Sequence, residues 1–139
     1  MNGTTDTPLI LTPIRYPLTA ESTRTLEHAS HVSEEHDDGQ LLVLHVDLVQ
    51  YDKHSTAQDI QRAIAPIVGD QPVNVIIRRG FLVEEVIREE AEQRGAEIIV
   101  IGKNRMAKWR RYINRLLGNH PDIASYLREH TDATIETTG

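Results

Sequence analysis

Basic side chains are concentrated in one short segment of an otherwise acidic chain. They are Lys103, Arg105, Lys108, Arg110, Arg111 and Arg115. No acidic residue lies between Glu97 and Asp122, although the chain as a whole has a formal net charge of -6. Such a segment can bind a phosphorylated ligand, dock on a polyanion or an acidic partner, or form the solvated side of a helix.

The spacing within this segment separates two groups of basic residues. Lys108, Arg111 and Arg115 recur at helical spacing, opposite an apolar stripe around Trp109. We expect the stripe to pack on the core and the basic face to meet solvent or a partner. The first two basic residues instead follow Gly102 directly, at the end of an apolar run.

The hydrophobic pattern predicts the elements that position the segment. Short runs typical of strands occur at residues 9–14, 41–46, 73–77, 97–101 and 133–138. The first four are rich in β-branched residues, as in strands buried on both faces, and helical periodicity separates the runs. The pattern predicts an α/β fold: a single-domain, doubly wound, five-stranded parallel sheet flanked by helices.

Local signals mark the ends of several helices. Ser55 and Gln58 match a capping box at the start of the second helix. Gly95 is typical of the residue that ends a helix, and Pro121 suits the first turn of a last helix running to about His130. We expect the glutamates of the third helix, among them Glu84 and Glu90, to form mostly its exposed face.

Composition narrows the class of protein. A chain of 139 residues suits one domain over residues 1–139, with residues 1–8 as a flexible N-terminus. No apolar run approaches the ~20 residues that span a bilayer, and no signal peptide is recognisable, so we expect a cytoplasmic protein without a membrane segment. The absence of cysteine excludes disulfides and thiolate chemistry.

In doubly wound sheets, ligands bind beyond the carboxyl ends of the strands, where the strand order reverses. The residues at these predicted ends are Arg15, Tyr16, Val46, Asp47, residues 78–80 and Gly102. We therefore expect Lys103 and Arg105 to emerge beside a ligand crevice.

Two long segments resemble the universal stress proteins. They are GFLVEEVIREEAEQRGAEIIVIGKNR and GNHPDIASYLREHTDATI. The start, ILTPIRYPLTAESTRTLEHASHV, is similar to the first strand and helix of that family, and LLVLHV is similar to its second strand. The resemblance covers nearly all of the chain from Leu9 and implies the family's adenine-nucleotide-hydrolase-like architecture.

The resemblance also implies where a nucleotide would bind. Nucleotide-binding members of the family carry Gly-x2-Gly-x9-Gly-Ser/Thr and an acid after the first strand. Gly102 matches the first glycine, Arg105 stands at the second, and Arg15 stands at the acid. Gly118 comes three residues later than the motif spacing allows, and Asn119 replaces the hydroxyl. The set implied around a ligand is Arg15, Val46, Gly102, Lys103, Arg105, Gly118 and Asn119, and we expect ATP or another adenine nucleotide to bind weakly or not at all.

Two functions remain open from the sequence. The first is a non-catalytic regulatory module like the universal stress proteins, whose crevice binds a nucleotide or another phosphorylated ligand. The alternative is an interaction protein that docks its basic helix, residues 103–115, on a polyanion or acidic partner, with a vestigial pocket. The acidic balance argues against nucleic-acid binding by the surface as a whole. The serines form no nucleophile elbow, so we assign no catalytic residue.

Two further features concern metals and oligomers. His28, His31 and Glu35 can share one helix face, but they lack a fourth ligand, and we interpret them as surface residues rather than a metal site. The last strand lies at a sheet edge in this topology, and the family commonly pairs this edge with a second copy. We therefore expect a homodimer through residues 133–138.

Overall fold

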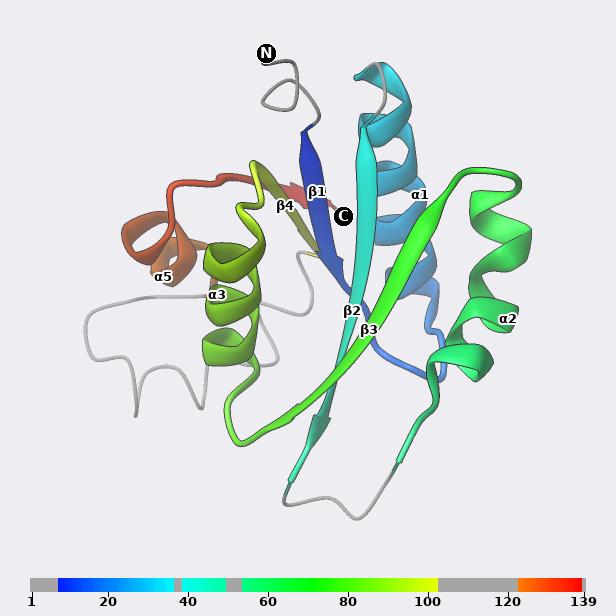
Figure 1. Ribbon diagram of the computed structural model, residues 1–139, viewed down its shortest axis with the longest axis horizontal. Coiled ribbons are helices and arrows are strands. Elements are labelled where there is room, and N and C mark those ends of the chain that lie inside the picture. Colours follow the sequence, from blue (N-terminus) through cyan, green and yellow to red (C-terminus); the bar gives the residue numbers. More distant parts are fainter. Residues whose placement is uncertain (1–7, 37–38, 50–53, 103–122, 139) are drawn as a thin grey trace.

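The computed structural model describes residues 8–36, 39–49, 54–102 and 123–138 (Figure 1). The elements are β1 (Leu9–Pro13), α1 (Ala20–Glu35), β2 (Gln40–Leu48), α2 (Ala57–Val68), β3 (Val73–Gly80), α3 (Val83–Arg94), β4 (Ile98–Gly102), α5 (Ile123–His130) and β5 (Thr134–Thr138). Apart from Pro8, the predicted flexible N-terminus lies outside the described residues. No helix among the described residues is long and apolar enough to cross a membrane.

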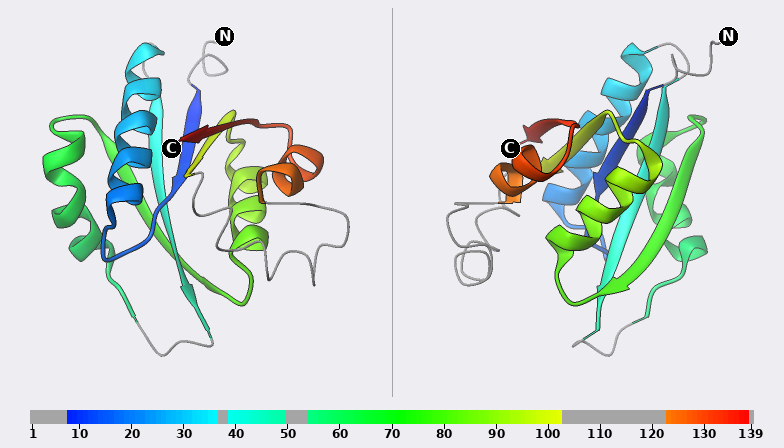
Figure 2. Two further views of the ribbon diagram at one scale, coloured as in Figure 1. Left: turned by 180° about the vertical axis from the view of Figure 1, so that it is seen from behind. Right: turned by 60° about the vertical axis from the view of Figure 1, so that its left-hand side comes forward.

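The strands form one sheet in the order β3-β2-β1-β4-β5, and every neighbouring pair is parallel. The helices α3 and α5 cover one face of the sheet, and α1 and α2 cover the other (Figures 1 and 2). This arrangement confirms the predicted doubly wound, five-stranded α/β fold. Each face has its own buried core, because alternate residues of the central strands point to opposite sides.

Strands β2 and β3 are longer than their apolar runs predict. The register pairs Pro13, the last residue of β1, with Leu44, whereas β2 continues to Leu48 opposite Gly80 of β3. The two strands therefore extend together beyond the end of β1. Asp47 and residues 78–80, which were expected to follow strands, belong to this extension. Polar residues interrupt the apolar pattern there, so the sequence did not reveal the true ends.

The helix ends follow the predicted signals in part. Thr56, not Ser55, caps α2, because its side chain accepts a hydrogen bond from the backbone N–H of Asp59. Ser55 instead donates its own backbone N–H to Asp47. Gly95 ends α3 at φ 66°, in the left-handed region that glycine adopts at low cost, as predicted. The last helix ends at His130 as expected, and Pro121 lies outside the described residues.

Candidate ligand crevice

The strand order reverses between β1 and β4. From β1 the chain adds β2 and β3 on one side, and it then returns to add β4 and β5 on the other. Buried Thr12 joins the two central strands, because its hydroxyl donates a hydrogen bond of 3.1 Å to the carbonyl of Val100. The carboxyl ends of β1 and β4 therefore flank the place where a doubly wound sheet offers a ligand crevice.

Arg15 lies at this edge of the sheet, just after β1. It follows buried Ile14, and it is exposed. Its backbone N–H donates to the hydroxyl of Ser22 at 3.1 Å, and Ser22 in turn donates its backbone N–H to Thr19, the N-cap of α1. No acid among the described residues forms an ion pair with the Arg15 guanidinium. This edge of the sheet thus has a cation, held at its backbone, where the family motif would place an acid.

Gly102 ends β4 beside α1 and β5. A Cβ at this position would lie 2.8 Å from the hydroxyl oxygen of Thr25. That hydroxyl lies 3.0 Å from the hydroxyl of Thr138 and donates to the carbonyl of Glu21 at 2.9 Å. The glycine is therefore required by the packing of α1 against the end of the sheet. This requirement holds with or without a phosphate in the crevice.

Val46 lies on β2, with polar neighbours on either side in the sequence. Its half-buried side chain packs against the core below α3, whereas His45 and Asp47 point to the opposite face and are buried there. Asp47 was predicted as a strand-end residue, whereas His45 was not among the predicted site residues. Polar residues at alternate positions of a strand would have been the signal, because both side chains then share one face.

His45 and Asp47 form a buried pair next to Arg15. Nε2 of His45 lies 2.8 Å from Oδ1 of Asp47, and Nδ1 lies 3.3 Å from the carbonyl oxygen of Ile14. The second carboxylate oxygen of Asp47 accepts the backbone N–H of Ser55 at 3.0 Å. The ring of Tyr16 meets the His45 ring edge-on, with centroids 6.3 Å apart. These contacts join the loop after β1 to the segment before α2.

The other residues of the predicted site cannot be placed. Lys103, Arg105, Gly118 and Asn119 lie outside the described residues, as does the basic face with Lys108, Arg111 and Arg115. The structure therefore brings together Arg15, Val46 and Gly102 at one edge of the sheet.

One histidine of α1 contacts the last strand. Nε2 of His28 lies 2.9 Å from a carboxylate oxygen of Glu136 on β5. Among the described residues, no three His, Cys, Asp or Glu side chains are arranged to hold a metal ion. His28 instead joins α1 to the last strand.

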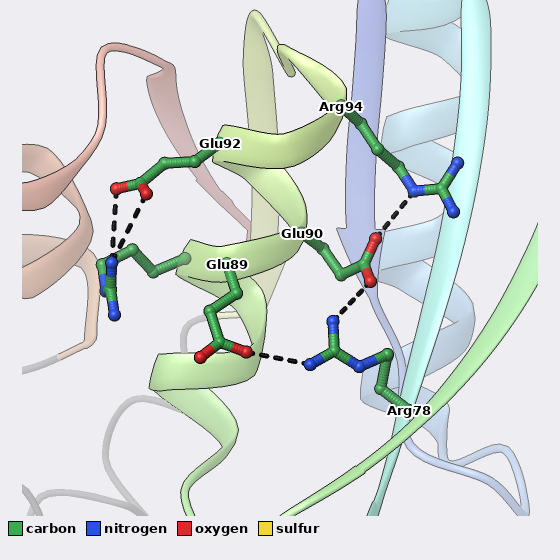
Figure 3. Close-up of polar contacts among 6 residues, drawn as sticks. Arg78, Glu89, Glu90, Glu92 and Arg94 are labelled. Atoms are coloured by element: carbon green, nitrogen blue, oxygen red, sulfur yellow. Dashed lines mark hydrogen bonds and ion pairs between the residues drawn. The ribbon is translucent and has the colours of Figure 1, made fainter.

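The prediction that the glutamates of α3 are mostly exposed is wrong for Glu84 and Glu90, which are buried. Glu90 accepts hydrogen bonds from Arg78 at 2.5 Å and from Arg94 at 2.7 Å, and Arg78 also contacts Glu89 at 2.8 Å (Figure 3). Burial raises the pKa of Glu90, but its hydrogen bonds with the two arginines outweigh this effect and lower the pKa overall.

Glu84 lies in the first turn of α3, at the carboxyl edge of the sheet. Its Oε1 atom is buried and has no hydrogen-bond partner among the described residues. Burial raises the pKa of this carboxyl, although the hydrogen bond to its own backbone N–H lowers it in part. Among the described residues, Glu84 is therefore a buried acid without a cation to neutralise it.

Comparisons with known proteins bear on the fold. No protein-family model matches the chain, and no curated protein matches it at a significant level. Solved structures do match. A universal stress protein in complex with cAMP has a TM-score of 0.65 at 12% identity, over 96% of this chain and 97% of that chain. The chain has the universal stress protein fold.

Further solved structures with this fold give the same result. A protein of the universal stress protein family from Burkholderia pseudomallei has a TM-score of 0.56 at 15% identity, over 94% of both chains. The universal stress protein from Archaeoglobus fulgidus in complex with dAMP has a TM-score of 0.55 at 12% identity, over 94% of this chain and 96% of that chain. The resemblance seen in the sequence is thus confirmed for the fold.

Proposed function

We propose that this chain is a non-catalytic regulatory module, similar to the universal stress proteins, that binds a nucleotide or another phosphorylated ligand. The ligand lies in the crevice at the carboxyl ends of β1 and β4. The module acts in the cytoplasm as part of a stress response. Its specificity differs from that of nucleotide-binding members with an acid after the first strand, because Arg15 stands at that position.

The observation that carries the proposal is the exposed Arg15 at the point where the strand order reverses. Its backbone is held by Ser22 at 3.1 Å, so the side chain starts from a fixed position. A guanidinium can bind a phosphate with two parallel hydrogen bonds. Two solved structures with this fold are complexes with cAMP and dAMP, which are phosphorylated ligands of this class.

Calorimetric titration with AMP, cAMP and magnesium ATP tests the proposal. We expect AMP or cAMP to bind, and ATP to bind weakly or not at all. Arg15→Gln should weaken mononucleotide binding about tenfold, the loss of one charge-assisted contact. Arg62→Gln is the matched control, since it removes the same charge from the exposed surface of α2. A wild-type protein that binds no mononucleotide at millimolar concentration would refute the proposal.

We also propose that the protein is a homodimer that pairs β5 with its twofold mate. The polar side chains of β5 support this arrangement, because Glu136 contacts His28 and Thr138 contacts Thr25. These side chains are directed to α1, and β5 has β4 as its only strand neighbour among the described residues. An edge strand presents backbone N–H and C=O groups that a second strand can pair with. Sedimentation equilibrium should give a dimer at tens of micromolar, and a monomer would exclude this pairing.

A further inference from the structure

The pair formed by His45 and Asp47 lies on the core face of a sheet whose neighbouring side chains are mostly apolar. The side chains of the two residues are 9% and 5% exposed. Burial of such a pair adds little to stability compared with apolar residues of similar size, because both groups lose their contact with water. The contacts of the pair are therefore a better guide to its role than its contribution to stability.

Both ring nitrogens of His45 lie next to acceptors. Nδ1 lies 3.3 Å from the carbonyl oxygen of Ile14, and Nε2 lies 2.8 Å from Oδ1 of Asp47. His45 therefore connects the backbone carbonyl at the end of β1 to a carboxylate of its own strand.

The contacts at the two ends of the pair lie in different loops. Ile14 immediately precedes Arg15. The carbonyl of Ile14 and the N–H of Arg15 therefore belong to the same peptide group. The Arg15 N–H donates to Ser22, so both polar atoms of this peptide group are held. At the other end, Asp47 accepts the backbone N–H of Ser55, which immediately precedes Thr56, the N-cap of α2.

We propose that His45 is a positioning residue of the crevice. It fixes the peptide group between Ile14 and Arg15, and thereby the point from which the Arg15 guanidinium reaches a phosphate. Asp47 holds the ring and joins it to the start of α2. The effect of His45 on ligand affinity rests on the proposed function. Its effect on the loop after β1 rests on the hydrogen-bond geometry alone.

Two conservative variants separate the contacts of the ring. His45→Asn places an amide near the position of Nδ1, so it keeps a donor for the Ile14 carbonyl and loses the contact with Asp47. His45→Gln places its amide near the position of Nε2, so it keeps the contact with Asp47 and loses the one with Ile14. Each variant loses one hydrogen bond of the pair, which makes them matched controls for one another.

The first readout is the affinity for AMP, measured by calorimetric titration. We expect His45→Gln to weaken AMP binding about tenfold, because a misplaced Arg15 loses about one charge-assisted contact with the phosphate. We expect His45→Asn to weaken it less than about threefold. A third variant, Ile64→Val, removes one methylene from the core under α2 and controls for a general loss of stability. Equal affinities in the two His45 variants would overturn the proposal.

The second readout is amide hydrogen exchange, which needs no ligand. The Arg15 amide should exchange faster in His45→Gln than in His45→Asn, because its peptide group loses the Ile14 contact. The Ser55 amide should show the reverse order, because Asp47 loses its partner in His45→Asn. Exchange rates that do not depend on the variant would refute the positioning role, even in a protein that binds AMP.

The two readouts also distinguish the failures. If the wild type binds no AMP but the exchange rates reverse between the variants, the proposed ligand class is wrong and His45 still positions the loop. If the wild type binds AMP and the two variants bind it equally, only the role of His45 is wrong.

A variant that does not fold is replaced by Asp47→Asn. In that variant the side-chain amide keeps a contact with Nε2 of His45, and Nδ1 keeps its contact with the Ile14 carbonyl, so binding should stay near that of the wild type.

Discussion

Glu90 and Glu84 lie on the same helix and are almost equally exposed, at 3% and 4%. They differ in the hydrogen-bond partners of their carboxylates. Glu90 contacts two arginines, one on β3 and one in the last turn of α3. Glu84 has a buried oxygen with no partner among the described residues. The pKa of Glu90 is lowered and that of Glu84 is raised from the ordinary value of 4.5.

The difference shows that burial alone does not define the role of an acid. Where arginines surround a buried carboxylate, the charge is stabilised and the contact joins two elements of the fold. Where no cation is present, the same charge costs stability. Glu84 lies in the first turn of α3, at the carboxyl edge of the sheet, whereas Glu90 lies further along the helix. The acid paired with arginines and the acid with the unpartnered oxygen therefore occupy different turns of one helix.

Replacement of Glu90 by Gln should have the largest effect. The variant leaves the guanidinium of Arg78, whose side chain is 30% exposed, without its buried counter-charge. We expect the free energy of unfolding to fall by about 3 kcal/mol, as when a buried ion pair loses one partner. Urea denaturation measures the change. Glu89→Gln is the matched control, because it contacts the same arginine but is 43% exposed, and it should cost much less. Equal losses in both variants would show that burial is unimportant for this cluster.

The pH dependence of stability should come from Glu90 in the acidic range. Because its pKa in the folded state is lower than in the unfolded state, the unfolded state binds the proton more tightly. The stabilisation is present above the unfolded pKa of about 4.5 and is lost as the pH falls through the lowered folded pKa. We therefore expect the difference between the wild type and Glu90→Gln to narrow on acidification from neutral pH to about pH 3. A difference that is independent of pH would contradict the ion-pair explanation.

The same substitution at Glu84 should have the opposite sign. At neutral pH, Glu84→Gln removes a buried charge whose Oε1 atom has no partner in the part of the chain that the structure describes, so the free energy of unfolding should rise by about 1 kcal/mol. The folded pKa of Glu84 is raised, so the folded wild type gains stability as the pH falls through that pKa to the unfolded value. The advantage of the variant should therefore disappear in acid. Glu85→Gln, in the same turn but exposed, is the control and should change stability little. A destabilised Glu84→Gln variant would mean that this carboxylate has a favourable partner.

The hydrogen bond between Arg88 of α3 and Tyr126 of α5 should have the smallest effect on stability. Nε of Arg88 donates to the hydroxyl of Tyr126 on α5 at 3.0 Å, and the arginine side chain is 27% exposed. Tyr126→Phe removes this hydrogen bond and keeps the ring, so we expect a loss of about 0.5 kcal/mol by urea denaturation. Glu92→Gln tests the neighbouring exposed ion pair of Arg88 and should be close to neutral. A loss as large as that of Glu90→Gln would place this contact among the main links of the fold.

The sequence was sufficient to predict the fold, because strands buried on both faces leave continuous apolar runs. It did not predict the extension of β2 and β3, where residues such as Asp47 and Arg78 interrupt those runs. Arg15 and Gly102 were placed at the crevice from the strand ends alone. The contact between His45 and Ile14 joins residues 31 positions apart and depends on where β1 stops relative to β2. No local pattern contains that register.

The buried glutamates of α3 were missed for a related reason. Glutamates occur on several sides of this helix, so helical periodicity could not separate an exposed glutamate from one paired with an arginine of β3. The arginine that decides the matter is 12 positions away from Glu90 and on another element. Charge pairs of this kind become visible only when the packing of the helix on the sheet is known.

The central position of β1 has a consequence for the synthesis of the chain. The neighbours of β1 are β2, which follows soon after it, and β4, whose Val100 is 88 positions away from Thr12. A nascent chain can assemble β1, β2 and β3 with their helices well before β4 has been made. Such long-range parallel pairing forms late, because closing the long loop costs conformational entropy before any contact between the strands can offset that cost. The edge proposed for the ligand is therefore completed only when β4 joins the other side of β1, and the proposed ligand would stabilise finished chains and not the partly synthesised half.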